Sequence, residues 1–101
     1  MAASAVSDGE TRRCSAAGLD VLVCNVEGGL YAIENRCSHA GSRLEAGKLK
    51  GYAISCPLHG GRFDVRTGVP LAAPARAPIR TFETFIEGGK VNIIRTVTQP
   101  R

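Results

Sequence analysis

Two cysteine–histidine motifs in the middle of this chain constrain its fold more than any other feature. The first reads Cys37-x-His39 and the second reads Cys56-x-x-His59, with sixteen residues between His39 and Cys56. A thiolate and an imidazole two or three residues apart are spaced as chelating ligands, because a loop can turn both donors toward one centre. Both histidines of the chain belong to these motifs, so a fold that uses them must bring two loops together.

Short strands separated by glycine turns flank these motifs. Paired glycines at 28–29 and 88–89 tolerate the positive φ angles that tight turns demand, so each pair predicts a β-hairpin. Residues 35–80 are rich in glycine and proline and show no helical stripe of apolar residues. The pattern therefore predicts an all-β domain with an inserted loop-rich region. The predicted strands are 11–17, 20–26, 30–33, 52–55, 62–65, 81–86 and 91–95.

Length and hydropathy narrow the class of protein further. The 101 residues suit one domain, which we expect to span 1–101. The apolar stretches are far shorter than the roughly 18 residues of a membrane helix, and the first residues do not resemble a secretory signal. The basic residues are not interleaved with aromatic residues and match no groove-reading motif, which argues against nucleic acid. We expect a soluble cytoplasmic domain without membrane or nucleic-acid partners.

The positive charge of the chain is concentrated in one segment. The net charge is +4, and residues 36–66 by themselves carry six basic and two acidic side chains, so the rest of the chain is neutral. Such an excess is either a solvated set of loop charges or a docking surface for a partner with an acidic patch. The basic residues of this segment are Arg36, Arg43, Lys48, Lys50, Arg62 and Arg66.

The residues around the two motifs resemble the loops with which Rieske proteins hold a 2Fe–2S cluster. They read Cys37-Ser38-His39-Ala40-Gly41 and Cys56-Pro57-Leu58-His59-Gly60-Gly61. The resemblance implies one cluster per chain, with Cys37 and Cys56 on the inner iron and His39 and His59 on the outer iron. It also implies the Rieske fold, an antiparallel β-sandwich with a cluster-binding subdomain at approximately 36–66. Two cysteines and two histidines would equally suit zinc, so a zinc-stabilised interaction module is an alternative.

The resemblance also distinguishes between kinds of Rieske protein. High-potential members carry a disulfide between the two loops, but Ser42 and Leu58 stand at the matching positions here. They also place serine and tyrosine hydroxyls near the cluster, where this chain has Gly61 and Phe63. Without those hydrogen bonds the reduced state is less stabilised, so we expect a midpoint potential near the low end of the Rieske range, about −150 mV.

Among Rieske proteins, the chain looks most like the free-standing ferredoxins of bacterial aromatic-ring dioxygenase systems. That likeness implies a monomeric one-electron carrier, not an enzyme, which serves aromatic hydrocarbon catabolism. It would accept electrons from a flavin-containing reductase and pass them to a terminal oxygenase. The alternative is the small Rieske subunit of a nitrite-reductase-like enzyme, which would co-purify with a large catalytic subunit.

The other two cysteines, Cys14 and Cys24, lie outside the motifs on strands predicted to be neighbours. A disulfide between them is conceivable, but a cytoplasmic setting argues against it. We expect both to be small buried apolar residues.

Overall fold

The computed structural model describes residues 2–16, 18–38, 42–57, 60–73, 75 and 77–98. Within these ranges the chain forms β-strands and two short 3-10 turns, and it contains no helix long and apolar enough to cross a membrane. The strands are β1 (Thr11–Ala16), β2 (Leu19–Val26), β3 (Gly29–Glu34), β4 (Leu49–Lys50), β5 (Ala53–Ser55), β6 (Arg62–Asp64), β7 (Pro70–Ala72), β8 (Thr81–Glu87) and β9 (Lys90–Thr98). The 3-10 turns are η1 (Ala3–Ala5) and η2 (Leu44–Ala46).

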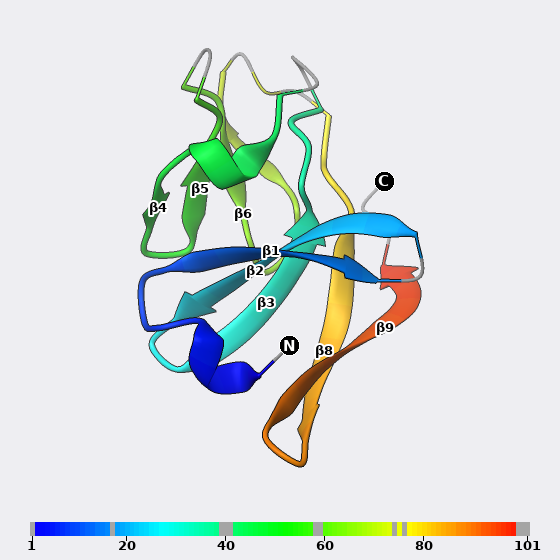
Figure 1. Cartoon of the computed structure of the whole chain (residues 1–101). Coiled ribbons are helices and arrows are strands. Elements are labelled where there is room, and N and C mark those ends of the chain that lie inside the picture. The colour runs from blue at the N-terminus through cyan, green and yellow to red at the C-terminus, as the bar shows by residue number, and fades with distance from the viewer. Residues whose placement is uncertain are drawn as a thin grey trace.

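The strands form two antiparallel sheets (Figure 1). The larger has the order β1-β2-β3-β8-β9 and the smaller the order β4-β5-β6-β7. The smaller sheet is an insertion, because β3 and β8 pair directly with each other through Ala32↔Phe82 and Ile33↔Thr81. The two sheets confirm the predicted all-β antiparallel fold, and the insertion stands at one end of the larger sheet in Figure 1.

Both predicted hairpins are present. Val26 pairs with Gly29 and Glu87 with Lys90, so each hairpin closes through two residues with positive φ. Positive φ at both positions matches the twist of the flanking strands. In the first hairpin one of these residues is not glycine: Glu27 has a φ of 52°, and the Asp8 carboxylate accepts a 2.8 Å hydrogen bond from its backbone N–H.

Three strands differ from the prediction. β9 runs to Thr98, beyond the predicted 91–95, because a bulge lets its end continue along β8: Phe82 pairs with Val97, but Glu83 pairs with Ile94. β4 was not predicted because two residues are too few to show an alternating pattern. β7 begins at a proline, which cannot donate a backbone hydrogen bond. An edge strand tolerates this residue because donors on its outer side have no neighbouring strand to bond.

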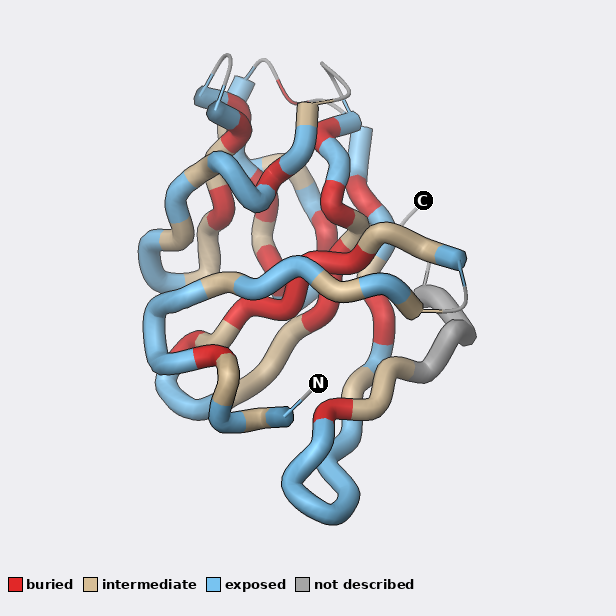
Figure 2. The backbone as a smooth tube through the Cα atoms, viewed as in Figure 1, coloured by how far each residue is buried: buried red, intermediate tan, exposed pale blue. Residues whose placement is uncertain are grey.

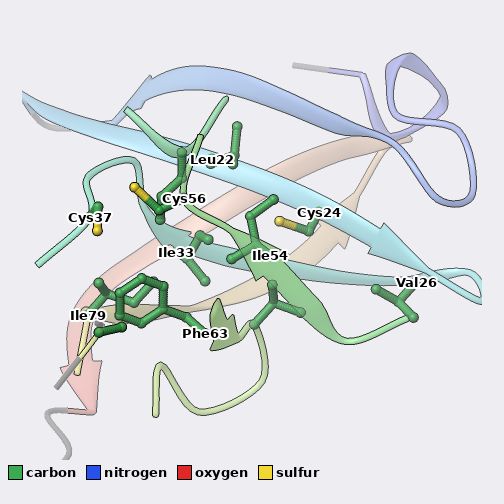
Figure 3. Close-up of a cluster of buried hydrophobic side chains, with 12 residues drawn as sticks. Leu22, Cys24, Val26, Ile33, Cys37, Ile54, Cys56, Phe63 and Ile79 are labelled. Carbon is green, nitrogen blue, oxygen red and sulfur yellow. The ribbon is translucent and has the colours of Figure 1, made fainter. Parts of the chain in front are cut away.

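The main hydrophobic core lies between the two sheets, and we call it the inter-sheet cluster (Figure 3). A smaller cluster of Val21, Ala32 and Phe82 covers the opposite face of the larger sheet. Strand β2 is therefore buried on both faces, and the buried stretch crosses the middle of the molecule in Figure 2. The members of the inter-sheet cluster are Leu22, Cys24, Val26, Ile33, Cys37, Leu44, Ile54, Cys56, Phe63, Val65, Ala75 and Ile79.

The register of β1 and β2 explains why Cys14 and Cys24 are both free thiols. Cys14 pairs with Val21, three residues before Cys24, so the two side chains point to opposite faces of the sheet. Cys24 belongs to the inter-sheet cluster, while Cys14 packs against the smaller one. The expected apolar role is confirmed for Cys24, and its burial raises the pKa of the thiol to about 12. Cys14 is only half-buried.

A group of aromatic and charged side chains joins the two sheets at the hairpin end of β2 and β3. The ring of Tyr52 meets that of Tyr31 edge to face, with centroids 5.8 Å apart. The Arg66 guanidinium lies 3.9 Å from the centroid of the Tyr52 ring and is 2.9 Å from an Asp64 carboxylate oxygen. The hydrogen bond from Arg66, although partial burial opposes it, holds the pKa of Asp64 below its ordinary value. The Tyr31–Tyr52 contact links the smaller sheet to β3, and Arg66 holds the Tyr52 ring from within the insertion.

The close approach of Gly47 to β5 yields a test of the fold. A Cβ at Gly47 would lie 1.7 Å from the backbone oxygen of Ser55, so Gly47→Ala must push η2 away from β5. We expect a loss of about 3 kcal/mol from overpacking, which lowers Tm by roughly 12–24 °C. Gly51→Ala is the control, because its Cβ would meet nothing within 4 Å and only the positive φ costs about 1–2 kcal/mol. Equal Tm values for the two variants would contradict the packing seen here.

Candidate metal centre

Cys37 and Cys56 are the two motif residues that the structure describes. Their exposed fractions are 2% and 3%, and both are free thiols of the inter-sheet cluster. Figure 3 shows them at the same edge of that cluster, although one follows β3 and the other follows β5. His39 and His59 lie outside the described residues. The fold thus brings together the half of the predicted ligand set that it describes.

The backbone around Cys37 is turned back on itself. The N–H of Cys37 donates a 2.7 Å hydrogen bond to the carbonyl of Ser42, five residues ahead. The hydroxyl of Ser38 donates to the carbonyl of Ala77, in the segment that leads into β8. Leu44 follows this loop and is fully buried in the inter-sheet cluster. Cys37 therefore has a fixed backbone at the root of its loop.

The backbone around Cys56 is closed in the same way. Its N–H donates to the carbonyl of Gly61 at 2.6 Å, and its carbonyl accepts from the N–H of Gly60 at 3.2 Å. Gly60 has a φ of 73°, a backbone conformation that residues other than glycine rarely adopt. These bonds extend the ladder between β5 and β6 by one step, so Cys56 also stands at the root of a closed loop.

The segment between β7 and β8 contacts the end of the second loop at Gly61, which the sequence did not reveal. A Cβ at Gly61 would lie 3.1 Å from the Cβ of Ala75, so only a small residue fits at position 61 without displacement. Ala75 and Ile79 are buried in the inter-sheet cluster with both thiols. Nothing in the sequence pattern indicated that this part of the glycine- and proline-rich region contacts the site.

The described residues fit a 2Fe–2S cluster. Its thiolate ligands bring negative charge and require a shielded site, and both thiols are buried among apolar side chains. Every buried side-chain nitrogen or oxygen in the described ranges has a hydrogen-bond partner. The described surroundings of the thiols therefore contain no unpaired buried polar side chain. The described residues by themselves hold no group of three metal-binding side chains, and the two histidines lie outside them.

Internal contacts neutralise part of the basic segment. Arg66 is bonded to Asp64 through two nitrogens, at 3.1 and 2.9 Å, and Arg43 lies 3.6 Å from the Asp20 carboxylate. The remaining four basic side chains belong to residues that are exposed to solvent, and the salt bridges among the described residues do not include them. These four are Arg36, Lys48, Lys50 and Arg62.

Comparisons with known proteins identify the family. Residues 1–83 match the Rieske [2Fe-2S] domain. The chain is 41% identical over 88 residues to the ferredoxin component of the naphthalene 1,2-dioxygenase system of Pseudomonas aeruginosa. The matched residues cover 87% of this chain and 85% of that protein. The chain therefore belongs to the Rieske [2Fe-2S] domain family.

Solved structures agree with this assignment. The ferredoxin of carbazole 1,9a-dioxygenase from Nocardioides aromaticivorans IC177 superposes with a TM-score of 0.88 at 35% identity, over 92% of this chain and 91% of that one. A ferredoxin from a complex of reduced oxygenase and oxidized ferredoxin in carbazole 1,9a-dioxygenase superposes with a TM-score of 0.86 at 38% identity, over 91% and 86% of the two chains. Within its family the protein is a ferredoxin of the aromatic dioxygenase type, an electron carrier with a Rieske 2Fe–2S cluster and not an enzyme.

Gly61 is bonded to the backbone of Cys56, and Phe63 belongs to the same cluster as both thiols; these positions generate a test of the low predicted potential. Gly61→Ser and Phe63→Tyr each add a hydroxyl next to a loop that carries a thiolate. A hydrogen bond to sulfur that is stronger in the reduced state raises the midpoint potential by about 40 mV for each kcal/mol of difference. We expect both variants to be more easily reduced in protein-film voltammetry.

Matched controls separate the hydroxyl from the added bulk. Gly61→Ala crowds Ala75 as Gly61→Ser does but adds no donor, and Phe82→Tyr adds a hydroxyl on the other face of the larger sheet. Both controls should keep the wild-type potential. An unchanged or lower potential in the serine and tyrosine variants would contradict the hydrogen-bond argument.

Proposed function

We propose that this protein carries single electrons from a flavin-containing reductase to a terminal oxygenase that attacks an aromatic substrate. The observation that carries the proposal is the pair of buried free thiols at the roots of two closed loops, at one edge of the inter-sheet cluster. The names of its relatives support it: one is the ferredoxin component of a naphthalene dioxygenase system, and another comes from a complex with an oxygenase.

The proposed ligands are Cys37, His39, Cys56 and His59, within a cluster-binding subdomain at approximately 36–66. The cysteines would hold the inner iron and the histidines the outer one, because buried thiolates suit a shielded position, whereas neutral imidazoles can reach solvent. When bound, the cluster supplies a one-electron couple. The closed backbone at both cysteines supports this assignment, since ligands with fixed backbones need little rearrangement when the charge of the site changes.

The apolar side chains around the thiols have a distinct role in the proposal. Leu44 and Phe63 are fully buried, and Ile79 is nearly so. They would exclude water from the sulfur side of the site and leave the opposite side as the route for electrons. The chain itself would move no proton and form no bond to a substrate, so the work of the protein is to hold the ligands and to present one face to its partners.

We further propose that the exposed basic residues Arg36, Lys48, Lys50 and Arg62 attract a partner with an acidic patch. They lie in the same segment as both cysteines. Positive charges near a docking site raise the rate of encounter with a negatively charged partner at low salt. A monomer in the cytoplasm would suit a carrier that alternates between two partners. The nitrite-reductase alternative predicts instead stable co-purification with a large subunit.

Replacing single cysteines tests the ligand assignment. We expect Cys37→Ser and Cys56→Ser to lose the cluster, and the loop-rich insertion should then become disordered because metal binding supports its folding. Iron and sulfide analysis and EPR of the dithionite-reduced protein measure the loss. Wild-type protein should contain two irons and two sulfides per chain and give a Rieske spectrum, whereas one zinc per chain would contradict the proposal.

Cys24→Ser is the matched control for these variants. Cys24 is as buried as the proposed ligands and lies in the same cluster, but its thiol has a raised pKa and stands on β2 away from the loops. This variant should lose stability and retain both irons. Full cluster occupancy in Cys37→Ser or Cys56→Ser would exclude that residue as an essential ligand.

Salt dependence tests the docking proposal. Electron transfer with the cognate reductase should slow as ionic strength rises from about 0.01 to 0.15 M, because the Debye length falls from about 30 to 8 Å. Arg36→Gln and Arg62→Gln should lower the rate at low salt and flatten its salt dependence. Lys90→Gln removes one exposed positive charge at the β8–β9 hairpin and should leave both unchanged. A wild-type rate that does not depend on salt would rule out electrostatic steering.

A further inference from the structure

Asn35 is a buried polar residue directly before the first cluster-binding loop. It follows β3, precedes Cys37 by two residues and is 1% exposed. Among the described residues up to Ile93 it is the only buried polar or charged one. A buried amide is costly unless its donors and acceptor are paired, so its partners indicate why it is there.

The Asn35 side chain closes the first loop. Its carbonyl oxygen accepts a 2.9 Å hydrogen bond from the backbone N–H of Glu45, and its amide nitrogen donates to the Glu45 carboxylate at 3.1 Å. Residues 35 and 45 are thus joined across the whole loop. Glu45 also lies in η2 beside Leu44, which is buried in the same cluster as Cys37. Both ends of the loop are therefore held at a fixed separation.

The same residue attaches the closed loop to the larger sheet. The Asn35 backbone N–H donates to the carbonyl of Asp20 at 3.0 Å, and its amide donates to the Asp20 carboxylate at 3.2 Å. Asp20 lies on β2 and accepts a further 2.8 Å hydrogen bond from Arg13. Arg43, from the first loop, lies 3.6 Å from Asp20 as well. Arg13 of β1 in turn lies 3.9 Å from the Glu45 carboxylate. Within this network Asn35 is the buried member, and it hydrogen-bonds to both the sheet and the loop.

Charge explains why an amide suits this position. Asp20 and Glu45 are both acidic and both meet the Asn35 amide nitrogen. Partial burial would raise the pKa of Asp20, but hydrogen bonds from Asn35 and Arg13 outweigh it and hold that pKa below its ordinary value. An apolar side chain at position 35 would remove a donor shared by two carboxylates and leave the N–H of Glu45 without its side-chain acceptor.

We propose that Asn35 is a positioning residue, which fixes the backbone of the first loop, and with it the sulfur of Cys37, relative to β2. This rests on the proposed role of Cys37 as an iron ligand. Outer groups that orient a ligand tune both its affinity for the metal and the properties of the metal site. Loosening this loop should therefore change the cluster itself, beyond any change in the stability of the fold.

Asn35→Leu and Asn25→Leu form a matched pair that tests the proposal. Asn25 also lies next to a strand turn of the larger sheet, donating to the carbonyl of Val6 at 2.8 Å and accepting from the N–H of Gly28 at 3.0 Å, but it supports the β2–β3 hairpin. Both variants should lower Tm. Only Asn35→Leu should shift the EPR g-values and the midpoint potential, and it should shorten the half-life of the cluster against an iron chelator by about tenfold or more.

Glu45→Ala is a milder variant that decides the question if Asn35→Leu does not fold. It removes the partner of the amide on an exposed residue and leaves the backbone hydrogen bond to Asn35 in place. We expect smaller changes in the same direction. The proposal would be overturned if the Asn35 and Glu45 variants kept the g-values, midpoint potential and chelator half-life of the wild-type protein. It would also be overturned if Asn25→Leu shifted these three quantities as Asn35→Leu does. A wild-type protein without a Rieske spectrum would instead refute the proposed function.

Discussion

The packing of the smaller sheet against the larger one is the interaction on which the site depends. The inter-sheet cluster contains both proposed thiolate ligands, so the same apolar contacts that hold the sheets together also shield the sulfurs. A chain of 101 residues buries only about 60–65% of the surface it would expose when unfolded, which leaves a thin core. Ligand binding between the two loops would therefore support the fold as much as the fold supports the site.

The insertion has a different attachment at each end. At the hairpin end of β2 and β3, Tyr52 packs edge to face against Tyr31, and Arg66 lies over the Tyr52 ring from within the insertion. At the end with the cysteines, Asn35 and Asp20 bind the first loop through hydrogen bonds. The direct pairing of β3 with β8 brings the two ends of the insertion together. The loops thus extend from a base that is restrained on all of these sides, which suits ligands that must keep their positions when the charge of the site changes.

Much of the fold followed from local patterns because the relevant residues are close together in the chain. Paired glycines indicated both hairpins, and Gly28 and Gly88-Gly89 supply all of their positive φ angles except that of Glu27. Short edge elements were harder to predict: β4 and β7 are too brief to show a period, and the end of β9 depends on a bulge opposite Phe82. The opposite orientations of Cys14 and Cys24 likewise depend on register.

The sequence by itself determined which donors this protein can offer to a metal centre, because ligand type and spacing are local properties: Cys37-x-His39 and Cys56-x-x-His59 each place a thiol and an imidazole on one short loop. Only the tertiary structure decided how the described part of that site is held. The burial of both thiols, the cover that Ala75 provides over Gly61 and the closure of the first loop by Asn35 and Glu45 all join residues distant in the chain. Such contacts depend on how the sheets pack, and no short-range pattern records them.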